Sequence, residues 1–428
     1  MTTRGDALSE LRARGLVEQA TAEEELGKLL ATESVSAYAG FDPTSPSLQV
    51  GNLVPLLLLR RLQRHGHRPI LVVGGATGMI GDPSGKSAER NLLSIDTIQD
   101  HTEGFRAQLA RFVDFEGTFG ALLVNNHDWT REVSYLDFLR DVGKHFSVNA
   151  MLAKESVHAR IESREQGISY TEFSYMLLQA FDFLHLAKNH GCRLQVGGSD
   201  QWGNITAGIE LVRRVLGKTV YGLTCPLVVT ASGEKFGKTA GNAVWLDPKM
   251  TSPFAFYQFW VRTEDRDAAR FLKLFTDVPL EDIAGLESRI ATEPEKRAAQ
   301  ARLAEEMTRL VHAQDGLAAA RAATDVLYGG AIANLSDRDL ADIFADVPSK
   351  NVPRARLADG IRLIDLACDA GLFPTKAEAK RRIDAGGVYV NNVRVADRDR
   401  VVGPADLASE SILVLRKGKK DYLLVRFE

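Results

Sequence analysis

Two lysines, Lys235 and Lys238, flank a Phe-Gly pair in the segment ASGEKFGKTAGN at residues 231–242. Ammonium groups on a flexible, glycine-containing loop can follow a negative charge as it moves, such as the charge that develops on a departing pyrophosphate. Taken alone, the segment is more typical of a solvated surface loop. Its interpretation therefore depends on which other groups the chain brings to the same site.

A helix with polar groups on one face is predicted from the segment SYMLLQAFD at residues 174–182. Tyr175, Gln179 and Asp182 follow one another at i, i+4 and i+7, so a helix places all three on the same side. A phenol, an amide and a carboxylate on one face are unusual for a packed core. The face is either a polar recognition surface at a binding site or the solvent side of an ordinary amphipathic helix.

Two glycine-rich segments resemble nucleotide-binding loops without matching their spacing. GDPSGKS, at residues 81–87, has three residues between Gly81 and Gly85, whereas a P-loop requires four. GGATG, at residues 74–78, does not have the GxGxxG spacing of nicotinamide-binding folds. A standard P-loop is therefore excluded, and a nicotinamide site is poorly supported.

These groups lie among alternating strands and helices. Residues 35–41 and 69–78 are strand-like, and residues 192–204 combine a strand with a glycine turn and the start of a helix. A further helix is expected at residues 52–64. The pattern predicts an α/β fold with a doubly wound, Rossmann-like parallel sheet, whose ligands bind at the carboxyl ends of the strands.

The second half of the chain changes character. Residues 250–328 are rich in Ala, Leu, Glu and Arg without a strand signal, which predicts helices. Residues 345–360 contain two prolines and are typical of a linker. Residues 361–428 contain short helices followed by short strands, with 13 Lys and Arg against 10 Asp and Glu. This mildly basic end is a weak indication of a polyanion-binding appendage.

The composition indicates a soluble globular protein. The 428 residues are 45% hydrophobic and 25% charged, and the net charge of −3 excludes a globally basic nucleic-acid-binding protein. The cysteines Cys192, Cys225 and Cys368 are too far apart for a disulfide framework or a CxxC metal pair. The N-terminal residues have no apolar signal core, and no run near them could span a bilayer. We therefore expect a cytoplasmic location and no membrane partner.

Several longer segments, in their order along the chain, resemble the bacterial tyrosyl-tRNA synthetases, which are class I aminoacyl-tRNA synthetases. The matching segments are GFDPT, GGATGMIGDPSGK, FLRDVGKHFSVN, YTEFSYMLLQAFDF, GGSDQWGNITAG, KFGKT and TSPFAFYQFW. The resemblance implies a tyrosine–tRNA ligase that makes tyrosyl-adenylate from L-tyrosine and ATP and then esterifies tRNA(Tyr). It also implies Mg²⁺ with the ATP, no tightly bound cofactor, no dedicated metal site and a homodimer.

By this similarity, six residues contact the amino acid: Tyr38, Asp82, Tyr175, Gln179, Asp182 and Gln201. Tyr38 and Asp182 are expected to hold the phenolic hydroxyl, because a hydroxyl and a carboxylate satisfy both its donor and its acceptor. Tyr175, Gln179 and Asp82 would surround the ammonium group, and Gln201 would lie near the carboxyl group. The residues expected along the ATP and adenylate cleft are Gly40, Asp42, Gly51, Gly198, Asp200 and Lys238.

The chemistry that the family performs needs no covalent enzyme intermediate. The tyrosine carboxylate attacks the α-phosphorus in line and pyrophosphate leaves, so that catalysis consists of positioning and cationic stabilisation. By similarity, the residues that would contact the phosphates or the ribose are Thr44, Gln49, Asn52, Lys86, Arg90, Lys235 and Lys238.

The sequence departs from the family at its signature, which usually reads His-Ile-Gly-His and here reads Gln49-Val50-Gly51-Asn52. The amide nitrogens of Gln49 and Asn52 can lie roughly where the histidine nitrogens do, but they cannot carry a positive charge. Replacing a charge-assisted bond by a neutral one costs about 1–2 kcal/mol, which slows activation without abolishing it. Asn52 can also serve as a helix N-cap, with Pro55 in the first turn.

The C-terminal segment resembles the small α-L RNA-binding module. Lys376, Lys380, Arg381 and Arg382 fall on one predicted helix, where they would contact phosphates; the alternative is a solvated basic helix. The predicted domains are a catalytic domain at 1–240 with a dimer-forming insertion at about 115–190, an α-helical anticodon-side domain at 241–330, a linker at 331–360 and a small α+β RNA-binding domain at 361–428.

Two other functions stay open from the sequence. The altered signature is compatible with a catalytically weakened paralogue that acts mainly as an RNA-binding protein. The fold is shared with tryptophan-specific synthetases, against which Tyr38, Asp182 and the C-terminal module argue.

Overall fold

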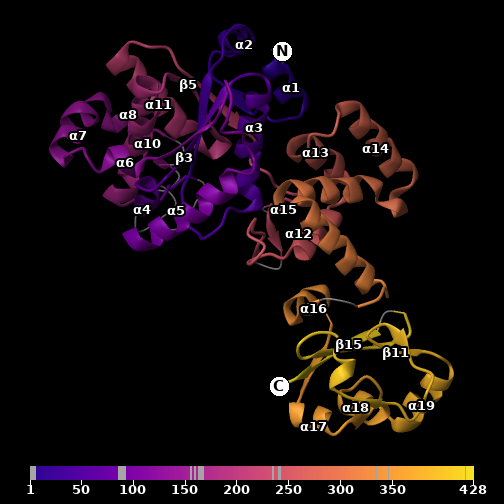
Figure 1. The fold of residues 1–428 in the computed structure, drawn as a ribbon. Helices are drawn as coiled ribbons and strands as arrows, with labels where there is room; N and C mark the ends of the chain where they lie inside the picture. The colour runs from indigo at the N-terminus through magenta and orange to yellow at the C-terminus, as the bar shows by residue number, and fades with distance from the viewer. Residues whose placement is uncertain are drawn as a thin grey trace. The chain divides into compact units, whose positions relative to one another are not determined.

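The computed structural model describes residues 6–84, 93–154, 157–158, 161, 168–233, 236–239, 242–332, 335–345, 347–419 and 421–428, without the side chains of residues 238, 239 and 242. The chain forms two compact units. The first unit comprises Met1–Asp247 and Val261–Leu303, and the second comprises Pro248–Trp260 and Ala304–Glu428 (Figure 1). The segment 241–330, expected as one helical domain, therefore contributes to both units.

A six-stranded sheet forms the centre of the first unit. Its strands are β1 (Gln19–Ala20), β2 (Ser36–Phe41), β3 (Arg68–Val73), β4 (Leu122–Asn125), β5 (Cys192–Gly198) and β6 (Tyr221–Cys225). They lie in the order β1-β6-β5-β2-β3-β4, and all neighbours are parallel except β1, which is antiparallel to β6. The strand order reverses between β2 and β5, which is where a doubly wound sheet binds its ligands. The predicted Rossmann-like fold class is confirmed.

The first unit also contains helices, most of them beside this sheet (Figure 1). They are α1 (Ala7–Ala13), α2 (Glu23–Thr32), α3 (Leu53–Arg64), α4 (Thr77–Ile80), α5 (Ile95–Leu109), α6 (His127–Thr130), α7 (Tyr135–Asp141), α8 (Val148–Leu152), α10 (Tyr170–Asn189), α11 (Trp202–Leu216), α13 (Asp265–Phe275) and α14 (Leu280–Thr292). Short 3₁₀ turns occur at η1 (Val50–Asn52), η2 (Gly143–His145), η3 (Ser199–Gln201) and η4 (Pro294–Lys296), and β7 (Lys238–Thr239) pairs with β8 (Asn242–Ala243). None of the described helices is long and apolar enough to cross a membrane.

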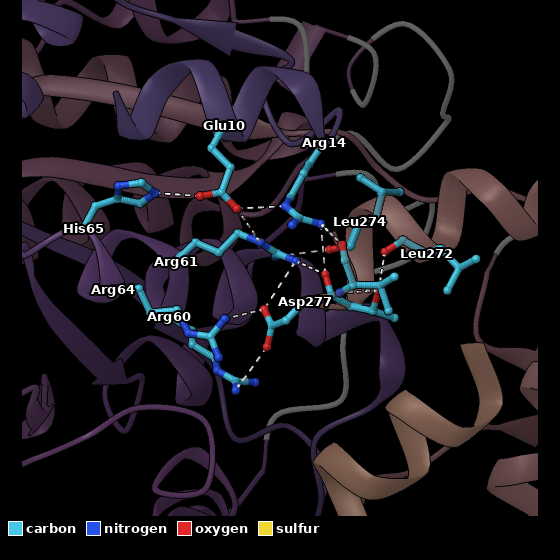
Figure 2. A network of polar contacts seen from close by, with 11 residues as sticks. Glu10, Arg14, Arg60, Arg61, Arg64, His65, Leu272, Leu274 and Asp277 are labelled. Atoms are coloured by element: carbon cyan, nitrogen blue, oxygen red, sulfur yellow. Dashed lines mark hydrogen bonds and ion pairs between the residues drawn. The ribbon is translucent and has the colours of Figure 1, made fainter. Parts of the chain in front are cut away.

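The predicted helix at residues 52–64 is α3, which begins just after the Gln49–Asn52 signature. Its leucines are buried, and Gly66 ends it with a φ of 83°, which a glycine adopts without strain. Its C-terminal arginines Arg60, Arg61 and Arg64 form ion pairs with Asp277, at N···O distances of 3.2, 3.8 and 2.7 Å (Figure 2). This network fixes α3, and with it the signature, against the loop between α13 and α14.

The second unit contains helices and a five-stranded sheet. Its elements are α12 (Pro253–Val261), α15 (Ala298–Leu327), α16 (Asp337–Ile343), β9 (Ser349–Val352), α17 (Arg354–Ala358), β10 (Ile361–Arg362), α18 (Leu363–Asp369), α19 (Lys376–Asp384), β11 (Val388–Val390), β12 (Val393–Arg394), β13 (Val401–Val402), η5 (Pro404–Asp406), β14 (Ile412–Lys417) and β15 (Asp421–Phe427). The unit boundary falls inside α12 and α15.

The C-terminal sheet has the order β12-β11-β14-β15-β9 and is buried on both faces. Along β14, Leu413 and Leu415 belong to one apolar cluster, whereas Ile412 and Val414 belong to another. The continuous apolar run of this strand follows from its two cores, because successive side chains point to opposite faces. In the segment 331–360, expected as a linker, the structure has α16, β9 and α17, and β9 adds a parallel strand to β15.

Candidate active site

Asp182 lies on α10 and is only 4% exposed. Its two carboxyl oxygens each accept a hydrogen bond of 2.9 Å, one from Nδ2 of Asn126 and one from Nε1 of Trp129. Burial raises the pKa of Asp182 to about 7; the two hydrogen bonds oppose the increase and the nearby Asp42 adds to it. The carboxyl group is therefore held in a fixed orientation and titrates near neutral pH.

The hydroxyl of Tyr38 is buried and has no hydrogen-bond partner among the described residues. Its pKa is well above the ordinary value because of burial, and then because of the charge of Asp182. A buried hydroxyl without a partner costs free energy, so this position favours a ligand that supplies one. Tyr38 and Asp182 are the two residues that the sequence predicts for a ligand hydroxyl, and a hydroxyl and a carboxylate are able to act as its donor and its acceptor.

Asp42 follows β2 and accepts hydrogen bonds from two hydroxyl groups. Oγ1 of Thr77 donates to its Oδ1 at 2.6 Å, and the phenol of Tyr175 donates to its Oδ2 at 2.9 Å. Burial, then the charges of Asp42 and Asp82, keep the pKa of Tyr175 well above its ordinary value, so that Tyr175 remains a donor. Thr77 also accepts from Nδ2 of Asn126 at 2.9 Å, which connects this group to Asp182.

A second polar group surrounds Asp82. Nε2 of Gln201 donates to Oδ2 of Asp82 at 2.6 Å, and Nε2 of Gln179 donates to Oε1 of Gln201 at 3.2 Å. The buried Asn204 donates through Nδ2 to Oε1 of Gln179 at 3.0 Å. The structure thus brings together Asp82, Gln179 and Gln201, three of the predicted substrate residues. A carboxylate beside two amides can bind both an ammonium group and a carboxylate group.

Two of the predicted glycines, Gly40 and Gly51, have open space beside the backbone, and Gly198 lies close to Asp200. At Gly40 and Gly51 an added Cβ atom would meet nothing within 4 Å, whereas at Gly198 it would lie 2.7 Å from Oδ1 of Asp200. Gly40 and Gly198 are at the carboxyl ends of β2 and β5, on either side of the point where strand order reverses. Thr44 lies in the loop after β2, and its N–H donates to the carbonyl of Asp42 at 2.8 Å.

The signature segment is tied to the chain that follows the KFGKT loop. Gln49 forms an isolated antiparallel bridge with Trp245, and the N–H of Val50 donates to the carbonyl of Val244 at 3.1 Å. Within the signature, the N–H of Gln49 donates to Oδ1 of Asn52 at 2.9 Å. Asn52 is the N-cap of α3 as predicted, although its side chain bonds to Gln49 and makes no capping bond to the helix.

The KFGKT segment contacts this signature directly. Gly237 has a φ of 85°, and a Cβ atom added there would lie 2.7 Å from Cγ2 of Val50. The ring of Phe236 packs on Phe271 and Phe275 of α13, with centroid distances of 4.9 and 5.2 Å. The backbone of Lys238 lies in β7. Its side chain and the predicted residues Lys86, Arg90 and Lys235 lie outside the described residues.

Sequence reasoning missed four polar residues of this site: Thr77, Asn126, Trp129 and Asn204. Asn126 and Trp129 follow β4, in a segment that reads LLVNNHDW. The signal that could have revealed them is an apolar run that ends in two asparagines, because the carboxyl end of a buried parallel strand is where polar ligand-binding groups gather. Among the described residues, no cluster of three or more His, Cys, Asp or Glu could hold a metal ion.

The four predicted RNA-contacting residues all lie on α19, and all are exposed. Lys376 forms an ion pair of 2.6 Å with Asp365, which raises its pKa. Thr375 caps the helix by accepting a hydrogen bond from the N–H of Glu378 at 3.2 Å. The exposed basic face of α19 is compatible with phosphate binding and with solvation alike.

Two family models match the chain. Residues 30–329 match tRNA synthetases class I (W and Y), and residues 339–425 match the Tyrosine--tRNA ligase SYY-like C-terminal domain.

Curated bacterial proteins resemble the chain over nearly its whole length. It is 51% identical over 422 residues to the tyrosine–tRNA ligase of Rhodopirellula baltica, covering 98% of this chain and 96% of that protein. It is 52% identical to the tyrosine–tRNA ligase of Roseiflexus castenholzii, covering 98% and 99%. It is 50% identical to that of Geobacillus kaustophilus, covering 99% and 100%.

Solved structures resemble the chain over about three quarters of its length. A C-terminally truncated mitochondrial tyrosyl-tRNA synthetase of Aspergillus nidulans matches with a TM-score of 0.67 and 33% identity, covering 74% of this chain and 92% of that one. The tryptophanyl-tRNA synthetase of Plasmodium falciparum matches with a TM-score of 0.52 and 12% identity, covering 78% and 87%, which supports the fold alone.

Proposed function

The chain belongs to the class I tRNA synthetases of the tryptophan and tyrosine family, and we propose that its site performs the two-step reaction of a tyrosine–tRNA ligase. The enzyme activates L-tyrosine with ATP to give tyrosyl-adenylate and pyrophosphate. It then transfers the tyrosyl group to the 3′ end of tRNA(Tyr). The observation that carries tyrosine as the substrate is the buried hydroxyl of Tyr38, which has no hydrogen-bond partner in the described part of the chain and lies near the carboxyl group of Asp182.

Selection for tyrosine follows from these two groups. The phenol of the substrate donates to Asp182 and accepts from Tyr38, so that all three polar groups are satisfied. Phenylalanine would leave both enzyme groups buried without partners, at a cost of about 1–3 kcal/mol for each group. The contacts of Asn126 and Trp129 support this role, because they leave the carboxyl group of Asp182 a fixed acceptor.

The rest of the amino acid fits the polar groups nearby. We assign its ammonium group to Asp82, Tyr175 and Gln179, and its carboxylate to the amide of Gln201. In support, the carboxyl group of Asp82 lies beside Gln201, whose Nε2 donates to its Oδ2 at 2.6 Å. The substrate carboxylate is then free to attack the α-phosphorus of ATP in line.

The adenylate extends along the open backbone at Gly40 and Gly51 and past Gly198, with its ribose hydroxyls on Asp200. Thr44, Gln49 and Asn52 would contact the phosphates or ribose as neutral donors. Lys86, Arg90, Lys235 and Lys238 would supply the positive charge that stabilises the departing pyrophosphate. Mg²⁺ would enter on the phosphates of ATP, since Mg²⁺ commonly keeps several waters and binds through phosphates rather than an all-protein cage.

Two features of the second unit support our proposal that the chain binds tRNA. The C-terminal family match covers α19, whose exposed Lys380, Arg381 and Arg382 form no described ion pair that would neutralise them. We propose that these residues and Lys376 contact the phosphates of tRNA(Tyr).

We also propose a homodimer and a cytoplasmic location. Around α7 and α8, large apolar side chains are exposed: Tyr135, Leu136, Leu139, Val148 and Leu152 have exposed fractions of 63, 75, 39, 60 and 38%. Monomeric proteins rarely expose such a group, and these residues lie in the predicted dimer-forming insertion. For the location, the thiols of Cys192, Cys225 and Cys368 are free, which suits a reducing compartment.

Exchange of labelled pyrophosphate into ATP tests the activation step. We expect exchange that depends on L-tyrosine and is at least about thirtyfold less efficient with L-phenylalanine, as the loss of about 2–6 kcal/mol over the two groups implies. Exchange driven by L-tryptophan would establish the alternative specificity, and no exchange with any of the three amino acids would support a paralogue that only binds RNA. Charging of tRNA with radiolabelled tyrosine tests the transfer step.

A further inference from the structure

The imidazole of His185 stacks on the indole of Trp129. The ring centroids are 4.3 Å apart and the planes differ by 12°. His185 lies on α10, three residues after Asp182, so both side chains belong to the same side of the helix. Trp129 therefore makes two contacts with α10. The face of its ring stacks on His185, and its Nε1–H donates to Oδ1 of Asp182 at 2.9 Å.

Trp129 needs such lateral support because of where it lies. It belongs to α6, which is only four residues long. A helix of one turn has little stability of its own, so its side chains take their positions from tertiary contacts. The indole is buried, at 8% exposure, and its N–H is one of two described donors to the carboxyl group of Asp182. A change in the angle of the ring would move that N–H off the carboxyl oxygen.

The surroundings of His185 favour the neutral form of its imidazole in this stack. Burial, then the charges of His190 and Lys188, lower its pKa below the ordinary value of a histidine. The His190 ring is 6.1 Å away and tilted by 45°, so it does not share the stack with Trp129. Among the described residues, the ring contacts of His185 are those with Trp129 and His190.

We propose that His185 is a positioning residue for amino-acid selection: its ring holds Trp129 at the angle that keeps the indole N–H on Asp182. This role rests on the proposed function, since it acts through the group that receives the substrate phenol. Loss of the ring weakens tyrosine binding while leaving the phosphate chemistry intact. It also narrows the preference for tyrosine over phenylalanine, because phenylalanine makes no bond to Asp182.

Three variants of the full-length enzyme test this role by pyrophosphate exchange. His185→Ala removes the stack, His185→Phe restores a flat ring, and Lys188→Ala is a matched control on the exposed side of α10. We expect His185→Ala to raise KM for tyrosine roughly three- to tenfold with kcat within twofold, as loss of one aromatic pair implies. His185→Phe and Lys188→Ala should both keep KM within twofold of the parent enzyme.

A second readout separates positioning from a general loss of structure. The indole ¹H–¹⁵N resonance of Trp129, assigned with a Trp129→Phe variant, should shift in His185→Ala and keep its position in His185→Phe. Two results would overturn the role. One is an unchanged KM for tyrosine in His185→Ala. The other is a fall in kcat as large as the rise in KM, which His185→Phe fails to reverse. Absence of tyrosine-dependent exchange in the parent enzyme would instead overturn the proposed function.

Discussion

The backbone N–H of Gln49 donates to Oδ1 of Asn52 at 2.9 Å, and the N–H of Asn52 donates back to the carbonyl of Gln49 at the same distance. This reciprocal pair fixes which way the Asn52 amide points, because its oxygen is already occupied by the backbone. Nδ2 is then the end left to act as a donor, as a histidine nitrogen would be at this position. We infer that the substitution in the signature keeps a hydrogen-bond donor and gives up only the option of a positive charge.

Two variants of Asn52 separate its structural bond from its role as a donor. Asn52→Asp keeps the acceptor for Gln49 but replaces the amide donor with a carboxylate, so we expect stability within about 0.5 kcal/mol and activation reduced at least tenfold. Asn52→Ala loses both groups and should also destabilise the protein by about 0.5–2 kcal/mol. Thermal unfolding and pyrophosphate exchange measure the two effects. Full activity in Asn52→Asp would show that Nδ2 contacts neither phosphate nor ribose.

Gln49→His should raise the rate of tyrosine activation. The backbone of Gln49 is fixed by its bridge with Trp245, so the new side chain starts from the same position. Gain of a charge-assisted bond is worth about 1–2 kcal/mol, or roughly five- to thirtyfold in rate, with KM for tyrosine within twofold. Single-turnover formation of tyrosyl-adenylate gives the rate directly. A slower histidine variant would mean that the site has adapted to glutamine.

The affinity for tyrosine should depend on pH through Asp182. In the free enzyme burial raises the pKa of this carboxyl group to about 7, and a substrate phenol that donates to the carboxylate must lower it. A group whose pKa falls on binding makes binding tighter as pH rises through the free-enzyme value. We therefore expect KM for tyrosine to fall several-fold between pH 6 and pH 8, at saturating ATP and constant ionic strength. A KM that stays constant over this interval contradicts the assignment of the phenol to Asp182.

Local patterns in the sequence predict the polar groups that share one helix, but they do not predict groups that only the order of the strands brings together. Tyr175, Gln179 and Asp182 were found because helical spacing alone puts them on one face. Asn126 and Trp129 reach Asp182 only because β4 lies beside β3, a neighbour relation that no local pattern encodes.

The C-terminal sheet contains a second contact that no local pattern in the sequence predicts. Two prolines indicated a linker at 345–360, yet Ser349–Val352 forms an edge strand because β15 offers it a partner. Pairing of this kind depends on a strand more than 70 residues away in the sequence.

Asp277→Ala should destabilise the first unit by about 1–3 kcal/mol. Asp277 faces three arginines, and one of them, Arg61, is 2% exposed with its pKa lowered to about 10 by burial (Figure 2). Removal of the carboxylate leaves that buried charge with Glu10, 4.0 Å away, as its remaining described counterion. The partial exposure of Asp277 moderates the cost further.

The matched control is Glu24→Ala, which removes a pair with Lys28 of the same 2.7 Å length as Arg64–Asp277. Both members of the control pair are over 70% exposed, so we expect a change below about 0.5 kcal/mol. Thermal melts of the two variants compare these costs, and equal shifts would show that burial of Arg61 does not matter.

Ala313→Gly should stabilise the second unit. Ala313 interrupts α15 with a φ of 60° and a ψ of −173°, a region that side chains other than glycine adopt at a cost of about 1–3 kcal/mol. The side chain of Ala313 is exposed, so its replacement by glycine removes no packing. Glycine loses more backbone entropy on folding than alanine does, which offsets about 0.5–1 kcal/mol of the gain. We expect a net increase of about 0.5–2 kcal/mol. Ala319→Gly, at an exposed helical position of α15, should lose about 1 kcal/mol instead. Opposite shifts in the melting temperature of the two variants are the expected result, and a loss in both would mean that residue 313 is helical in solution.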